Sequence, residues 1–223
     1  MLHKTRGIVL RFTPYRESTI IVNIFTELFG LQAYIVNGVR SKQAKSNKIA
    51  FFQPLTLLDM VVYHKENANM HRLKEFRCYY PYVELGSNII KSSMGIFLNE
   101  LFNKVLREES HAHEIFSFVG DAMITLDKQQ KGIENFHLIL MVKLSHYLGF
   151  GPANVQELLG PRYVNEEEQN VLAQIIKADF DTFIKLSNEK RRILLGQLLA
   201  FYQEHIDGLG EMRSVNVLRE VLD

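Results

Sequence analysis

Residues 7–36 read GIVLRFTPYRESTIIVNIFTELFGLQAYIV, and this stretch decides the fold of the N-terminal part of the chain. It contains three short runs rich in β-branched and aromatic residues, which are typical of strands. Turn-forming residues separate these runs, which cover residues 7–12, 19–26 and 31–36. We therefore expect three strands in close succession.

Two further runs of the same kind follow at 54–63 and 73–79, and a lysine-rich stretch at 37–48 precedes them. Five short strands within about eighty residues, separated by Gly, Pro and polar turns, are typical of a small barrel. We expect this barrel to be closed or nearly closed.

The hydrophobic period changes beyond Glu84 to spacings of three and four, which predict helices. The apolar face of the first predicted helix runs from Ile89 to Val105, and Ser110 is a candidate N-cap of the second. The stretch 136–148 is apolar nearly all round, which indicates a buried central helix. Further helices are predicted after an Asn165 cap, at 191–205 and at 215–222.

The fold class is therefore α+β, with a five-stranded barrel followed by a C-terminal α-helical domain. We place the barrel domain at 1–80 and the helical domain at 81–223, because Pro81 and Gly86 mark a short connection there.

The composition is that of an ordinary globular chain, with 223 residues of which 47% are hydrophobic and 23% charged. This excludes a disordered protein. No run of about 18 apolar residues and no secretory signal pattern occur, so we expect no membrane span and no secretion. Cys78 is the one cysteine of the sequence, which suits a reducing, cytoplasmic location.

No pattern of catalytic residues emerges from the sequence. A Gly-rich phosphate loop and a Gly-x-Ser-x-Gly turn are both absent. His111 and His113 lie beside acidic residues, but side chains two apart on a helix point away from each other. We expect a non-enzymatic protein without a metal site or a cofactor.

The formal net charge of +1 hides an uneven distribution. Residues 1–80 carry 12 Lys and Arg against 5 Asp and Glu, whereas residues 81–223 carry 14 against 20. The basic part favours a polyanionic or acidic partner. The alternative is that the asymmetry serves only solubility.

Basic and aromatic residues of the predicted barrel favour nucleic-acid binding. Cations neutralise phosphates and aromatic rings stack on any base, which suits single strands bound without sequence choice. The candidate phosphate-binding residues are Arg6, Arg11, Arg16, Arg40, Lys42, Lys45 and Lys48, and the candidate stacking rings are Tyr15, Phe29 and Tyr34. Two alternatives stay open, namely that the lysine-rich loop is merely solvated and that the rings belong to the core.

Lys190, Arg191 and Arg192 open a predicted helix, where positive charge opposes the helix dipole. This placement indicates an acidic partner for these cations. Such a partner is either another molecule or a nearby acidic side chain of the same chain.

Six short segments of the chain form a recognisable set, namely KTRGIVL at 4–10, YRES at 15–18, IFT at 24–26, GVRSK at 38–42, FFQPL at 51–55 and LREVL at 218–222. Together these segments resemble the RecO family of bacterial DNA repair proteins. The resemblance covers essentially the whole chain in the family's usual order. It implies an N-terminal OB-fold and a C-terminal helical domain in a bacterial protein associated with the nucleoid.

The resemblance also implies a recombination mediator. Such a protein binds single- and double-stranded DNA, anneals complementary strands and helps to load RecA onto strands coated by single-strand-binding protein. The implied partners are RecR, the acidic C-terminal tail of the coating protein and, indirectly, RecF and RecA. Lys190, Arg191 and Arg192 are candidates for binding that tail.

The chain departs from the family at one place. Many members carry four cysteines as a zinc site after the long central helix, but the corresponding stretch 149–171 has no cysteine. A zinc-free member is therefore implied. Two other functions stay open: a protein-binding adaptor with incidental DNA contact, and an RNA-binding barrel protein.

Overall fold

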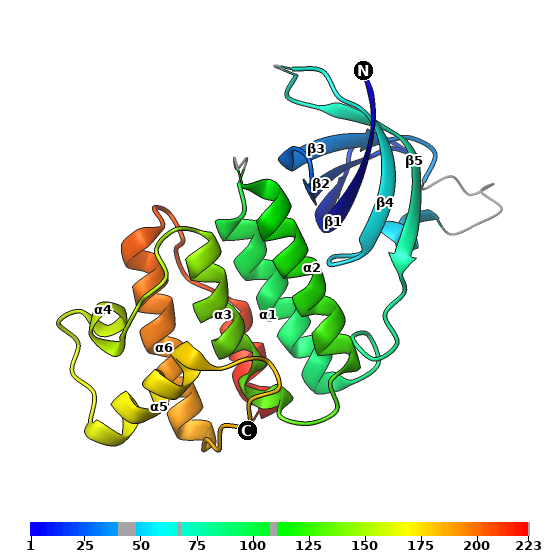
Figure 1. Ribbon diagram of the computed structural model, residues 1–223. Helices are drawn as coiled ribbons and strands as arrows, with labels where there is room; N and C mark the ends of the chain where they lie inside the picture. Colours follow the sequence, from blue (N-terminus) through cyan, green and yellow to red (C-terminus); the bar gives the residue numbers. More distant parts are fainter. Residues whose placement is uncertain (40–47, 67, 108–110, 223) are drawn as a thin grey trace. The chain divides into compact units, whose positions relative to one another are not determined.

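A computed structural model of the chain describes residues 1–39, 48–66, 68–107 and 111–222. Five strands in this part of the chain close into a barrel in the order β1-β2-β3-β5-β4 (Figure 1). They are β1 (Leu2–Pro14), β2 (Ile20–Thr26), β3 (Gly30–Val36), β4 (Leu57–Tyr63) and β5 (His71–Tyr80). Neighbouring strands pair antiparallel except β3 and β5, whose short parallel ladder closes the barrel. The predicted barrel and the expected OB-fold are confirmed.

The barrel interior is filled by alternate residues of the strands. Ile20, Val22 and Ile24 of β2 are fully buried, whereas the intervening Ile21 and Asn23 are partly exposed. A 3-10 helix, η1 (Lys48–Phe52), follows the lysine-rich stretch and adds its last aromatic ring to this core. The strand pattern read from the sequence is therefore the one that builds the core.

The described chain divides into two compact units. The first unit comprises residues 1–82 and 102–123, and the second comprises 83–101 and 124–223. Within the first unit, the amide of Asn103 donates a hydrogen bond to the carbonyl of Leu10 at 3.2 Å, so the helical segment is tied to the barrel. The expected division into domains at residue 80 stays a prediction.

The helices lie close to the predicted positions. Their bounds are α1 (Ile89–Val105), α2 (Ala112–Lys128), η2 (Ile133–Asn135), α3 (Phe136–Tyr147), α4 (Val155–Leu159), α5 (Glu166–Lys177), α6 (Asn188–His205) and α7 (Ser214–Leu222). Most of α3 is buried, which confirms a central helix. Asn165 caps α5 in a reciprocal capping box with Glu168, as its sequence predicts.

The stretch 149–171, where the family's zinc site was expected to be missing, contains α4 and leads into α5. The sequence did not predict α4. Among the described residues, none of the helices has the length and apolar character that crossing a membrane requires. The same residues contain no group of three His, Cys, Asp or Glu side chains arranged to hold a metal ion.

Candidate nucleic-acid interface

A groove of about 680 Å³ lies on the barrel, between the outer side of β2 and β3 and the segment that joins β4 to β5. OB-folds bind oligonucleotides on this side and with this connecting segment. Amides, imidazoles, one ammonium group and the carboxylate of Glu66 line the groove, and all of these except the carboxylate can donate to phosphate and base edges. Its lining residues are Asn23, Leu31, Gln32, Ala33, His64, Lys65, Glu66, Ala68, Asn69 and His71.

Arg11 lies beside this groove. Arg11 of β1 lies opposite Asn23 on the neighbouring strand β2, and Asn23 lies opposite Ala33 on β3. With its amide oxygen turned to the guanidinium, Asn23 accepts hydrogen bonds from Nε of Arg11 at 3.0 Å and from Nη2 at 3.2 Å. The side chain of Arg11 remains exposed, so its charge is available to a strand in the groove.

Tyr15 and Arg16 form an exposed pair in the turn between β1 and β2. The guanidinium of Arg16 lies 5.3 Å from the centre of the Tyr15 ring, and the ring is 51% exposed. This turn belongs to the segments with which OB-folds contact oligonucleotides. Both residues are exposed, and their predicted roles in phosphate binding and base stacking stay predictions.

The structure describes residues 37–39 and Lys48 of the lysine-rich stretch. Lys48 is exposed at the start of η1. Arg40, Lys42 and Lys45 lie outside the described residues, so their predicted contacts with phosphate stay predictions.

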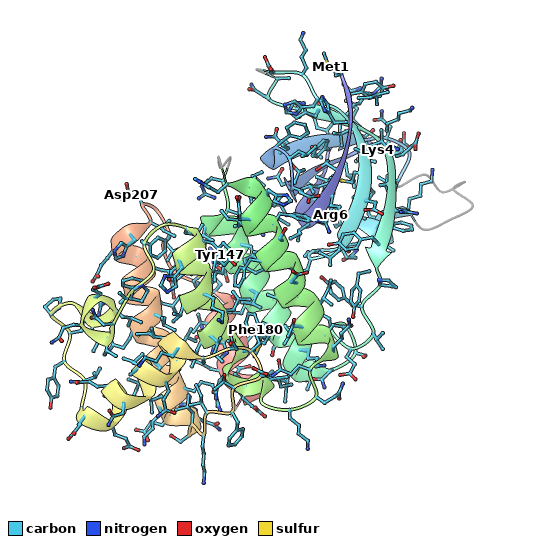
Figure 2. All side chains as sticks on the ribbon, viewed as in Figure 1. Met1, Lys4, Arg6, Tyr147, Phe180 and Asp207 are labelled. Carbon is cyan, nitrogen blue, oxygen red and sulfur yellow. The ribbon has the colours of Figure 1, made fainter. Side chains whose placement is uncertain are left out.

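Arg6 has an internal partner that the sequence analysis did not predict. Lys4 and Arg6 lie on β1, which Met1 directly precedes (Figure 2). The guanidinium of Arg6 donates to both carboxylate oxygens of Glu27, from Nε at 2.9 Å and from Nη2 at 2.7 Å. This hydrogen bonding holds the pKa of Glu27 below its usual range. A phosphate bound to Nε and Nη2 would have to displace Glu27, so we leave Arg6 out of the candidate interface.

The surroundings of Arg6 explain this bidentate pair. The guanidinium lies 5.1 Å from the centre of the Phe116 ring of α2, and the imidazole of His113 contacts the same Glu27 carboxylate at 3.1 Å. Arg6 and Glu27 thus attach the start of α2 to the barrel within the first unit. Arg6 therefore has an internal role, and its predicted DNA contact stays a prediction.

The three candidate rings differ in exposure. Tyr34 is fully buried in the barrel core, which is incompatible with base stacking and corrects that prediction. Phe29 is half-buried, and one face of its ring stacks on His64 with centroids 3.9 Å apart and an interplanar angle of 3°. Tyr15 is therefore the candidate whose ring is open to solvent.

The ring stack at Phe29 includes histidines that the sequence analysis did not single out. His64 also stacks on His71, with centroids 4.3 Å apart, while His3 meets Phe29 edge-on at 5.3 Å. One signal was present in the sequence. His64 follows the fourth strand and His71 opens the fifth, so antiparallel pairing of these strands brings the two rings together.

Two family models match the chain. The model described as recombination protein O N terminal matches residues 1–82, and the model described as recombination protein O C terminal matches residues 86–159. The chain belongs to the RecO family. The DNA repair protein RecO of Flavobacterium psychrophilum is 34% identical, and that of Flavobacterium johnsoniae is 32% identical, each over 98% of both chains. RecO of Azobacteroides pseudotrichonymphae is 28% identical over 100% of both chains.

Membership of the RecO family makes this chain part of a family of DNA repair and recombination proteins. The OB-fold barrel described above is the part that the N-terminal RecO model covers. The groove on the barrel is therefore the leading candidate for a nucleic-acid interface.

Two of the cations at the start of α6 in this RecO family member, Lys190 and Arg191, contact side chains of the same chain. The ammonium group of Lys190 pairs with Glu167, which is the nearby acidic side chain considered above. Arg191 is only 7% exposed and donates to the side-chain oxygens of Asn135 at 3.1 Å and Asn188 at 2.8 Å. Arg191 is thus a buried hydrogen-bonding residue, and Arg192 is the exposed cation of the three.

Arg192 lies at a small cleft of the second unit. Arginine and leucine side chains surround the cleft, and the buried ring of His137 reaches it. The lining residues are His137, Asn188, Arg191, Arg192, Leu195, Leu218, Arg219 and Leu222. The cleft has a volume of only about 10 Å³, which is too small for an apolar side chain, so the feature that suits an acidic peptide is the exposed charge of Arg192.

Proposed function

We propose that this RecO family member is a non-enzymatic mediator of homologous recombination. In this role it binds single- and double-stranded DNA, anneals complementary strands and helps to load RecA onto strands coated by single-strand-binding protein. The observation that carries the proposal is the polar groove over β2 and β3 on an OB-fold barrel.

The proposed DNA path follows the exposed cations around this groove. Arg11 adjoins the groove through Asn23, Lys65 lines it, and Arg16 with Tyr15 extends it onto the turn between β1 and β2. Lys48 and the sequence-predicted Arg40, Lys42 and Lys45 add charge from the segment between β3 and β4.

Annealing is an expected consequence of such a path. Cations that neutralise phosphates reduce the repulsion between two strands. A path that holds the backbone leaves the base edges free to pair. A protein of this kind needs no catalytic group to bring complementary strands together.

The test of the proposal is the binding of a fluorescent single strand of about 30 nucleotides across a salt series. Changing Lys42, Lys45 and Lys48 together to Glu is expected to weaken binding tenfold or more at low salt, which is about 1.4 kcal/mol. The matched control changes Lys131, Lys177 and Lys185 of the second unit to Glu, and it should leave the affinity near that of the unaltered protein. Equal affinities for the two triple variants would remove the lysine-rich stretch from the path.

The same assay separates the alternative functions. A shallow salt dependence would favour a protein-binding adaptor, because few phosphates would then be neutralised. Tighter binding of a matched RNA strand would favour an RNA-binding barrel, since the 2′-hydroxyl distinguishes the two strands.

A second proposed contact is with the acidic C-terminal tail of single-strand-binding protein. The cleft beside Arg192 supports it, because exposed positive charge there adjoins Leu195 and Leu218. Arg192→Glu should weaken binding of a peptide copying that tail and leave DNA affinity unchanged, with Lys185→Glu as the charge-matched control. Unaltered peptide binding by the Arg192 variant would exclude this cleft.

We also propose RecR as a direct partner, with RecF and RecA acting through the assembled complex. These partners are those implied by membership of the RecO family. Co-purification of the chain with RecR is the corresponding test.

A further inference from the structure

The histidines at the groove form one connected stack. His64 lies between Phe29, 3.9 Å away, and His71, 4.3 Å away, so both faces of its imidazole are covered. His3 approaches the same ring edge-on, with centroids 6.2 Å apart. Phe29, His64 and His71 thus form a stack of three rings, and His3 meets both Phe29 and His64 edge-on.

This stack is part of the groove wall. His64 and His71 line the groove together with Lys65 and the amides of Asn23 and Gln32. Within the part of the chain that the structure describes, Nδ1 of His64 is buried without a hydrogen-bond partner. A proton added to this imidazole would place a positive charge at the groove wall.

The free protein disfavours that proton. Burial is the main cause that lowers the pKa of His64, and His71, His3 and the N-terminal ammonium of Met1 add to it. Glu66 acts in the opposite sense. The ammonium of Met1 lies close because it donates to the carbonyl oxygen of His64 at 2.9 Å.

A phosphate in the groove would reverse this balance. A phosphate anion is attracted by an imidazolium and offsets the repulsion from the neighbouring cations. A group whose protonation is disfavoured in the free state and favoured in the bound state takes up a proton on binding.

We propose that the groove binds the phosphate backbone of single-stranded DNA with uptake of a proton by the histidine stack, His64 being the residue that is protonated. This inference rests on the proposed function, because it assigns a proton to the same DNA path. It makes single-strand affinity increase as the pH falls through the neutral range.

The test compares affinity for an oligothymidine of about 12 nucleotides at about pH 6 and pH 7.5, at constant ionic strength. The unaltered protein should bind roughly fivefold or more tightly at the lower pH, since uptake of one proton changes affinity by at most about tenfold per pH unit. His64→Phe retains an aromatic ring against Phe29 but cannot take up a proton. It should bind equally at both pH values, whereas His113→Gln should keep the pH dependence.

A measurement on the unaltered protein makes the test independent of how the variants fold. Calorimetry of the same oligonucleotide in two buffers of different ionisation enthalpy counts the protons taken up on binding. We expect an uptake approaching one proton near neutral pH. No uptake, or a pH dependence retained by His64→Phe, would overturn the inference and leave DNA binding in place. Absence of binding at both pH values would overturn the inference and the proposed function together.

Discussion

Asp127 is a buried carboxylate whose hydrogen bonds fix the chain before α1. It is 2% exposed and accepts hydrogen bonds from the backbone amides of Val83, Glu84 and Leu85 at 2.8–3.1 Å. The ammonium of the buried Lys91 donates to the backbone carbonyl of Asp127 at 2.7 Å and to the carboxylate of Glu84 at 2.6 Å. These contacts satisfy several polar groups that would otherwise be buried without partners.

Asp127→Ala is therefore expected to lower the free energy of unfolding by about 3 kcal/mol, because it leaves buried backbone donors unpaired. Urea denaturation measures this change. Asp181→Ala, at an exposed aspartate of the same unit, should change the stability by less than about 0.5 kcal/mol. Similar small losses for both variants would contradict the role assigned to Asp127.

His137 provides a prediction on pH. Burial lowers the pKa of its ring to about 3, and neither ring nitrogen has a hydrogen-bond partner among the described residues. Between this value and the ordinary pKa of 6.5, the unfolded chain binds a proton that the folded chain does not. The stability contributed by a neutral His137 is therefore full above pH 6.5 and is lost as the pH falls below it.

His137→Leu should remove this dependence. At about pH 5.5 the unaltered protein should have lost about 1.4 kcal/mol from this residue relative to pH 7.5, and the variant should lack that loss. Urea denaturation at the two pH values gives the difference directly. An unchanged pH dependence in the variant would show that other groups account for it.

The exposure of the charged residues at the candidate site was predictable from the sequence, because charged side chains usually remain in contact with water. Arg11, Arg16 and Lys48 are exposed as expected, because a lone cation on a barrel is costly to bury. The prediction that Tyr34 stacks on a base was wrong, because the sequence does not show which face of the strand carries the tyrosine. Only the strand register places it in the core. The ion pair of Arg6 was not predicted because its partner Glu27 is distant in sequence.

At the scale of elements, the space around a glycine shows how closely neighbouring elements pack against it. A Cβ atom on Gly7 of β1 would lie 2.5 Å from Cγ2 of Ile24 and from Cε of Met60, so the barrel has no room for a side chain there. Gly196 of α6 is different, because a Cβ there would have no neighbour within 4 Å. The two positions predict opposite effects of the same substitution.

Gly7→Ala should destabilise the protein by about 1–3 kcal/mol through overpacking. Gly196→Ala should stabilise it by about 0.5–1 kcal/mol, since alanine restricts the unfolded chain and favours a helix. Denaturant titrations of the two variants side by side measure both changes. A gain of stability for Gly7→Ala would contradict the packing described for Gly7, and a loss for Gly196→Ala would contradict the open space described for Gly196.

The elements themselves were largely predictable because their hydrophobic periods differ. Buried and partly exposed residues alternate along β2, and apolar residues occur on nearly all sides of α3, so both elements gave clear signals in the sequence. The predicted N-cap at Asn165 was confirmed. The helix α4 has five residues, which is too short for a helical period to show. The groove was not predictable, because it depends on how the segment after β4 approaches β2 and β3.

At the scale of the whole molecule, the charge asymmetry persists when the chain is divided as the structure divides it. Residues 1–82 and 102–123 carry 14 Lys and Arg against 9 Asp and Glu, whereas the remaining residues carry 12 against 16. The unit with the barrel is therefore basic and the other acidic. This separation favours DNA on the first unit and agrees with a groove bordered by cations.

The most direct test of this account is the salt dependence of single-strand binding by a variant with Arg11→Glu and Lys65→Glu. Both residues adjoin the groove, so the variant should bind at least about tenfold more weakly at low salt. Its slope against salt should be shallower by roughly 1.4, which corresponds to the loss of two phosphate contacts. The control with Lys131→Glu and Lys185→Glu should match the unaltered protein. Equal affinities and equal slopes for the two variants would show that DNA does not follow the groove over β2 and β3.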